Sequence, residues 1–134
     1  MAGCNDNFKM TILLNAEVIN RLKKRINETF ADGKRRVEWK EACREFHAKY
    51  EELAFPGGER TAYKRILSGD YNAIEAGLAF IECRPYFFRS GYMFKDLLRK
   101  LKKAPLDDGQ QQRLDIVIKK FKDYKAQRKA APPH

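Results

Sequence analysis

Apolar residues recur at steps of three and four along almost the whole chain, and this spacing constrains the fold more than any other feature. Side chains three or four positions apart lie on one face of an α-helix, whereas a half-buried strand needs strict alternation. No segment alternates convincingly, and short breaks at proline and glycine divide the periodic segments. The sequence therefore predicts an all-α fold: a compact single-domain bundle of five to six short helices, with stacked helical hairpins as one arrangement.

The first periodic segment, from about residue 7 to 30, can begin in two ways. Asp6 could cap one long helix, or residues 8–14 could be extended, with Asn15 capping a later start. We favour a helix throughout, and Gly33 is its expected end. The apolar face of this helix is expected to consist of Phe8, Ile12, Ile19, Leu22, Ile26 and Phe30.

The remaining helices are each bounded by a cap or a break. They are expected over about residues 39–53, over 59–67, from a cap at Asp70 to Cys83, from a cap at Ser90 to Pro105, and onward from Asp107 or Asp108. Their core-facing residues are predicted to be Trp39, Cys43, Phe46, Tyr50, Leu53, Ile74, Gly77, Leu78, Ile81, Phe94, Leu97, Leu98, Leu101, Leu114, Val117, Ile118, Phe121 and Tyr124. We take residues 1–129 as one domain and 130–134 as a disordered tail.

Length and cysteine usage limit the class of protein. A chain of 134 residues has the usual size of one domain and can bury a core without disulfides or metal. The three cysteines are odd in number and widely spaced, which favours a reducing compartment. No apolar run resembles a signal peptide or a membrane span, so we expect a cytoplasmic protein with no membrane partner.

The net charge of +10 is unevenly distributed along the chain. Residues 1–83 carry 14 Lys and Arg against 13 Asp and Glu, a balance of +1. Residues 84–134 carry 14 against 5, a balance of +9. Such asymmetry indicates a polyanionic partner, although a basic domain can also use its charge for solubility alone.

Helical spacing arranges many of these charges into two ridges. One ridge follows the helix after Ser90 and the other follows the last helix, and two antiparallel neighbours could merge them into one surface. The residues that we expect to contact nucleic acid are Arg89, Lys95, Arg99, Lys102, Lys103, Lys119, Lys122 and Lys125. The alternative is a protein-interaction module, an inhibitor or adaptor, that docks on an acidic partner surface.

The stretch RPYFFRSGYMF, residues 84–94, places five aromatic residues among basic ones. Aromatic rings can stack on unpaired bases while arginine and lysine contact phosphates. The same rings can instead anchor the corner between two helices in the core, which is the commoner use of a phenylalanine-rich corner. The sequence leaves both interpretations open.

No motif for catalysis, metal binding or cofactor binding is found. Cys43 and His47 are four apart on a helix, but two ligands do not make a metal site, and Cys43 lies in the apolar stripe. The adjacent carboxylates Glu51 and Glu52 diverge on a helix. We therefore expect a binding protein rather than an enzyme, with no cofactor.

Overall fold

The computed structural model describes the backbone of residues 2–32 and 36–130 and the side chains of residues 7–30 and 36–129. Within these residues it consists of α-helices joined by turns and short loops, so the predicted all-α class is confirmed. The helices are α1 (Ala2–Asp32), α2 (Arg36–Ala54), α3 (Ala62–Leu67), α4 (Tyr71–Cys83), α5 (Ser90–Lys103) and α6 (Asp108–Ala130). Two of them, α1 with 31 residues and α6 with 23, are longer than the short helices expected.

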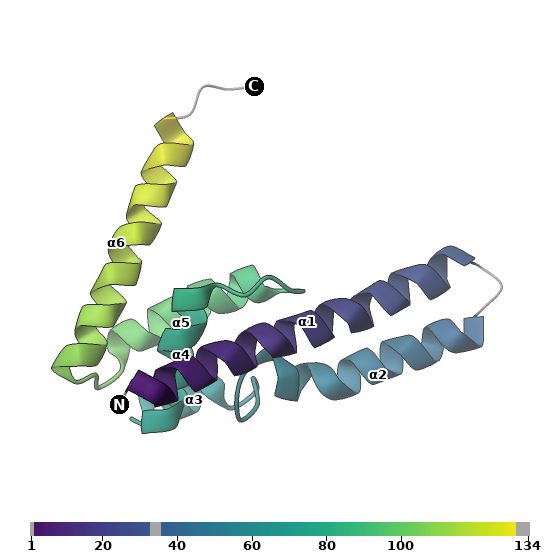
Figure 1. The fold of residues 1–134 in the computed structure, drawn as a ribbon, viewed down its shortest axis with the longest axis horizontal. Coiled ribbons are helices and arrows are strands. Elements are labelled where there is room, and N and C mark those ends of the chain that lie inside the picture. Colours follow the sequence, from purple (N-terminus) through teal and green to yellow (C-terminus); the bar gives the residue numbers. More distant parts are fainter. Residues whose placement is uncertain (1, 33–35, 131–134) are drawn as a thin grey trace.

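Helices α1 and α2 form a long antiparallel hairpin (Figure 1). The favoured interpretation of α1 is confirmed, because residues 8–14 are helical and the extended alternative is wrong. The helix begins at Ala2, ahead of Asp6, so Asp6 is not its cap. The expected end at Gly33 lies outside the described residues. Of the expected tail at 130–134, Ala130 is the last residue of α6, and residues 131–134 lie outside the described residues.

Helix α4 is the centre of the fold. Every residue from Ala73 to Ile81 is buried, because α1, α3, α5 and α6 all pack against this one helix. Gly77 permits the closest approach: a Cβ added there would lie 3.2 Å from Ile66 Cδ1 and 3.5 Å from Leu101 Cδ2. The largest fully buried side chains around α4 include Ile19, Phe55, Ile66, Leu78, Phe80, Leu97, Leu101 and Leu114.

Two of the predicted caps, Asp70 and Asp107, are confirmed, and Ser90, like Asp6, is not a cap. The Asp70 carboxylate accepts from the Ala73 N–H at 3.0 Å and caps α4. Asp107 caps α6 in a reciprocal pair, because Gln110 N donates to Asp107 at 2.7 Å and Asp107 N donates to the Gln110 side chain at 3.1 Å. Ser90 does not cap α5: it is the first residue of that helix, and its Oγ instead accepts from Phe87 N at 3.1 Å.

Helical periodicity overestimates burial where a helix runs past its neighbours. Phe30 and Tyr124 were expected in the core, but both side chains are exposed. Phe30 lies near the free end of the α1–α2 hairpin, where the Trp39 ring lies 5.9 Å away between ring centroids. Tyr124 lies in the second half of α6, which extends away from the other helices (Figure 1). In the second helix Phe46 is buried as predicted, whereas Trp39 and Cys43 are only half-buried.

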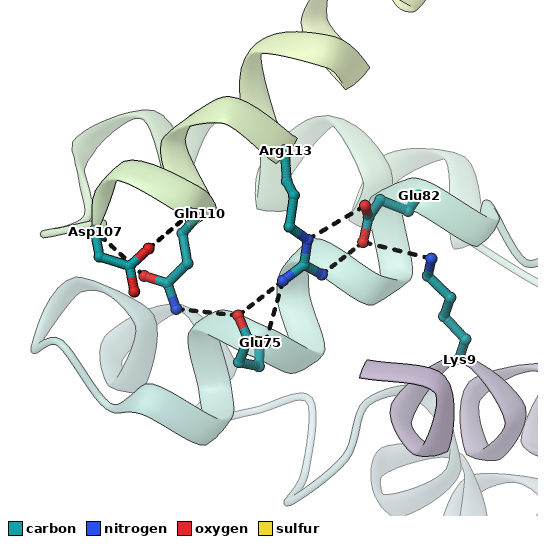
Figure 2. Close-up of polar contacts among 6 residues, drawn as sticks. All are labelled: Lys9, Glu75, Glu82, Asp107, Gln110 and Arg113. Carbon is teal, nitrogen blue, oxygen red and sulfur yellow. Dashed lines mark hydrogen bonds and ion pairs between the residues drawn. The ribbon is translucent and has the colours of Figure 1, made fainter. Parts of the chain in front are cut away.

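A cluster of charged side chains fastens α6 to α4 (Figure 2). Arg113 of α6 donates to both oxygens of Glu75, at 2.9 and 3.1 Å, and to both oxygens of Glu82, at 2.6 and 3.3 Å. Gln110 donates to Glu75 at 3.0 Å, and Lys9 of α1 lies 3.8 Å from Glu82. Only 5% of Glu75 is exposed, and its carboxylate is nevertheless fully paired.

The two carboxylates also act on the titration of Arg113. Burial by itself disfavours the charged guanidinium and lowers its pKa, but the hydrogen bonds and charges of Glu82 and Glu75 outweigh burial. The net result is a raised pKa for Arg113, whose guanidinium is in any case always charged in proteins. The sequence reasoning did not identify this cluster.

Candidate nucleic-acid interface

The corner between α4 and α5, residues 84–89, begins and ends on a strained arginine. Arg84 has φ 45° and Arg89 has φ 70°, in the left-handed region that suits glycine. This conformation costs an L-residue roughly 1–2 kcal/mol. Backbone strain of this kind is found preferentially at functional sites, where the surrounding structure holds it in place.

Hydrogen bonds from two other helices hold the corner. Asn20 of α1 donates through Nδ2 to the Tyr86 carbonyl at 2.8 Å. Tyr50 of α2 donates its hydroxyl to the Phe88 carbonyl at 2.7 Å. The Ser90 N–H donates to the Phe87 carbonyl at 2.9 Å and completes the turn into α5. Three consecutive carbonyls of the corner are therefore fixed.

The tyrosine in this set titrates abnormally. Burial raises the pKa of Tyr50 to about 12, with a further increase from the nearby Glu59 charge and an opposing effect of Arg89. The Tyr50 hydroxyl therefore remains a hydrogen-bond donor well above neutral pH.

The aromatic rings of the corner divide between the two uses that the sequence left open. Phe87 and Phe94 are buried, and Phe87 packs against Phe80 and Tyr50 in the core. Tyr86, Tyr92 and Phe88 are 87%, 70% and 46% exposed. The fold therefore uses part of the aromatic stretch as an anchor and presents the rest to solvent.

These exposed rings and three cations line one open groove of about 570 Å³. We call it the basic–aromatic groove and define it by Asn20, Lys23, Tyr86, Phe88, Arg89, Tyr92 and Lys95. The Lys23 Nζ lies 4.8 Å from the Phe88 ring centroid, and the Arg89 Cζ lies 5.9 Å from the Tyr92 ring centroid. Among the described residues, neither Lys23, Arg89 nor Lys95 forms an ion pair with a carboxylate.

The groove continues into a line of charges along α5. Tyr92, Lys95, Arg99 and Lys102 follow one another at steps of three, four and three, so they lie on one face of the helix. We call Lys95, Arg99, Lys102 and Lys103 the α5 stripe; all four side chains are exposed. Arg99 also pairs with Asp96 on the same helix.

All eight residues predicted to contact nucleic acid are exposed, but they lie in different surroundings. Arg89 and Lys95 line the groove, and Arg99, Lys102 and Lys103 continue from it. On α6, Lys119, Lys122 and Lys125 are exposed, and Lys125 lies 4.6 Å from the Phe121 ring centroid. Residues 122–129 are exposed throughout, on the half of α6 that extends away from the other helices (Figure 1).

Sequence reasoning missed two residues of the groove. Lys23 and Asn20 belong to α1, in the part of the chain whose charges nearly balance, so composition gave no reason to single them out. Lys23 follows Leu22 in an ordinary amphipathic pattern, and only the packing of α1 beside the corner brings it to Phe88. The signal that did exist was the aromatic stretch itself.

Other groups considered from the sequence do not assemble into a site. His47 is exposed, Cys43 is half-buried, and across residues 7–30 and 36–129 no three His, Cys, Asp or Glu side chains gather as metal ligands would. None of the helices in the described ranges has the length and apolar character needed to cross a membrane. Comparisons of the chain with protein families, curated proteins and solved structures gave no match.

Proposed function

We propose that this protein is a non-enzymatic binding module whose ligand is a polyanion, specifically nucleic acid, held in the basic–aromatic groove and along the α5 stripe. The observation that carries the proposal is the groove itself, where Lys23, Arg89 and Lys95 surround exposed aromatic rings. Surfaces that bind single-stranded nucleic acid typically combine basic residues with aromatic side chains on which bases stack. Among the described residues that line the groove there is no carboxylate or imidazole, which favours binding over acid–base chemistry.

Most charges of the groove and the stripe are available for a ligand; Arg99 is the exception, because it pairs with Asp96. Lysine and arginine bind phosphate by charge and hydrogen bonding, and each phosphate neutralised releases counterions. Lys95, Lys102 and Lys103 have no carboxylate within ion-pair distance among the described residues, so a bound phosphate would not have to displace one. The expected partner therefore binds tightly at low salt and weakly at high salt.

The lysines of α6 are assigned a supporting role. Lys119, Lys122 and Lys125 extend the positive field beyond the groove and steer a polyanion towards it. They lie outside the basic–aromatic groove, although Lys125 lies beside the Phe121 ring and Tyr124 of the same helix is exposed. Their substitution is expected to slow association more than it speeds dissociation.

The test is binding of a labelled oligonucleotide of about 12 nucleotides, followed by fluorescence anisotropy at several salt concentrations. The variant carries Lys95→Glu, Arg99→Glu and Lys102→Glu together. Loss of three phosphate contacts should weaken binding by about 100-fold at 0.1 M salt. It should also reduce the slope of log affinity against log salt concentration by about 2.

A matched control carries Arg36→Glu, Lys40→Glu and Arg44→Glu, which changes the net charge equally at exposed positions in the first half of α2, towards the free end of the α1–α2 hairpin (Figure 1). Their effect should stay within about threefold, because salt screens charges that lie far from the ligand. Equal losses in both variants would assign binding to net charge and overturn this site. Absence of any binding at low salt would overturn the function and leave an acidic protein as the partner to seek.

A further inference from the structure

We infer that the basic–aromatic groove takes unpaired bases, so that the ligand is single-stranded rather than duplex nucleic acid. This inference rests on the proposed function and adds the substrate class. It is carried by the exposure of Tyr86 and Tyr92, neither of which makes a ring–ring contact among the described residues. Phe88, which is 46% exposed, also packs edge-on against Phe46 and Tyr50, so only part of its ring is open to a ligand. The core does not need the two tyrosine rings, and exposure of their apolar faces to water is unfavourable.

The exposed rings offer what an unpaired base requires. Stacking needs an accessible ring face, and the bases of a duplex already stack on one another, whereas those of a single strand do not all do so. Tyr86 and Tyr92 are the two most exposed rings of the corner, and both line the same groove. Its volume of about 570 Å³ lies within the range of sites that hold small organic groups.

The backbone of the corner is fixed before a ligand arrives. Asn20 and Tyr50 hold the carbonyls of Tyr86 and Phe88, so the backbone that carries these rings cannot turn freely. A site that is ordered in advance loses less conformational entropy when it binds. The left-handed residues Arg84 and Arg89 end α4 and precede α5, and so set the direction of the chain on both sides of the corner.

The charges beside the rings fit a strand that crosses the groove and follows α5. Lys95 lies one turn beyond Tyr92, and Lys102 lies seven residues further along, about 10 Å at the rise of an α-helix. The bases would stack at the corner while successive phosphates meet Lys95, Arg99 and Lys102. Stacking contacts and phosphate contacts are therefore separate and can be removed separately.

The experiment compares three probes of equal length on the full chain: a single strand, the corresponding duplex, and an abasic strand with the same phosphates. The single strand, as DNA and as RNA, should bind at least about tenfold more tightly than the abasic strand. It should also bind more tightly than the duplex. Tyr86→Ala with Tyr92→Ala should remove this advantage and leave the affinity for the abasic strand unchanged.

Two controls distinguish base stacking on the Tyr86 and Tyr92 rings from other effects of the substitutions. Tyr86→Phe with Tyr92→Phe keeps the ring faces and should retain the preference, which would not be so if the hydroxyl groups were responsible. Tyr71→Ala removes an exposed tyrosine from α4, outside the groove, and should change nothing. Both tyrosines of the groove are exposed, so their substitution should leave the melting temperature within a few degrees of wild type.

The outcomes distinguish this inference from the proposed function. Equal affinity for the single strand and the abasic strand, or tighter binding of the duplex, would overturn the preference for unpaired bases while binding of nucleic acid stands. Failure of all three probes to bind at low salt would overturn both. Loss of the preference in the Tyr→Phe variant would overturn stacking as its cause.

Discussion

The cluster around Arg113 and the corner around Arg89 both contain arginine, but the two charges are placed in opposite ways. Arg113 is held by four hydrogen bonds to Glu75 and Glu82 and joins α6 to α4 (Figure 2). Arg89 has no carboxylate within ion-pair distance among the described residues, and its backbone is strained. The first arrangement stabilises the fold, whereas the second leaves a cation accessible at a cost in backbone energy.

The contrast teaches where to look for function in a basic protein. Net charge alone does not separate charges that are neutralised internally from those that remain for a ligand. Pairing and backbone conformation do separate them, and both differ between these two regions. Substitutions at the cluster should change stability, and substitutions at the corner should change binding.

The largest expected effect comes from Arg113→Leu. Removal of this guanidinium leaves Glu75 buried without a charged partner, and a broken buried pair costs about 3 kcal/mol or more. Urea unfolding followed by circular dichroism measures the loss. Arg128→Leu, an exposed position on the same helix, should change stability by less than about 0.5 kcal/mol. A loss below about 1 kcal/mol for Arg113→Leu would mean that the cluster does not hold α6.

The strain at the corner predicts a difference between two substitutions of Arg89. Both Arg89→Gly and Arg89→Ala remove the same charge, but only glycine adopts φ 70° without a steric cost. The free energy of unfolding, measured with urea, should therefore be about 1 kcal/mol higher for the glycine variant than for the alanine variant. Both should weaken oligonucleotide binding equally. Equal stability of the two variants would indicate that the corner carries no strain at this position.

Tyr50→Phe tests the hydrogen bond that holds the Phe88 carbonyl. The ring contacts remain, the donor is lost, and stability should fall by about 1 kcal/mol. Affinity for the single strand should fall with it, because the ring of Phe88 is no longer fixed. Tyr71→Phe is the control, because the Tyr71 hydroxyl forms no hydrogen bond with any of the described residues. Unchanged affinity in Tyr50→Phe would show that the corner stays ordered without this bond.

A further expected effect appears only at high pH. The pKa of Tyr50 is raised from 10.0 to about 12 by burial first and by Glu59 second, so folding favours its neutral form. Its contribution to stability is complete below pH 10 and is lost as the pH rises towards 12. The stability gap between wild type and Tyr50→Phe should narrow over this interval, measured as urea midpoints at each pH. A constant gap would contradict the raised pKa.

The sequence was sufficient to predict the helices and most of the core. The three- and four-residue spacing correctly predicted Ile12, Ile19, Leu78 and Leu101 as buried, and the cap at Asp70 was recognisable from residue type alone. These features depend on local geometry. Local rules failed for Tyr124, because burial there depends on whether another helix lies alongside, which periodicity does not reveal.

The candidate site was predictable only in part. The aromatic stretch identified the corner, but which rings face outward depends on how α1 and α2 pack against it. Glu75 stands inside the most apolar helix of the chain, and this carboxylate in an apolar run was an available signal of a buried partner. Its partner Arg113 is 38 residues away and could not be assigned from the sequence.

The hydrogen bonds of the corner make the groove depend on folding of the whole chain. Asn20 reaches Tyr86 across 66 residues, and Tyr50 reaches Phe88 across 38. Closing such long loops costs conformational entropy, which the packing of α1 and α2 against the corner has to offset. The positive charge of the second half of the chain needs no folding, whereas the groove exists only when the α1–α2 hairpin is packed against the corner. A fragment of residues 84–134 would keep the charge excess and lack Asn20 and Lys23, which complete the groove.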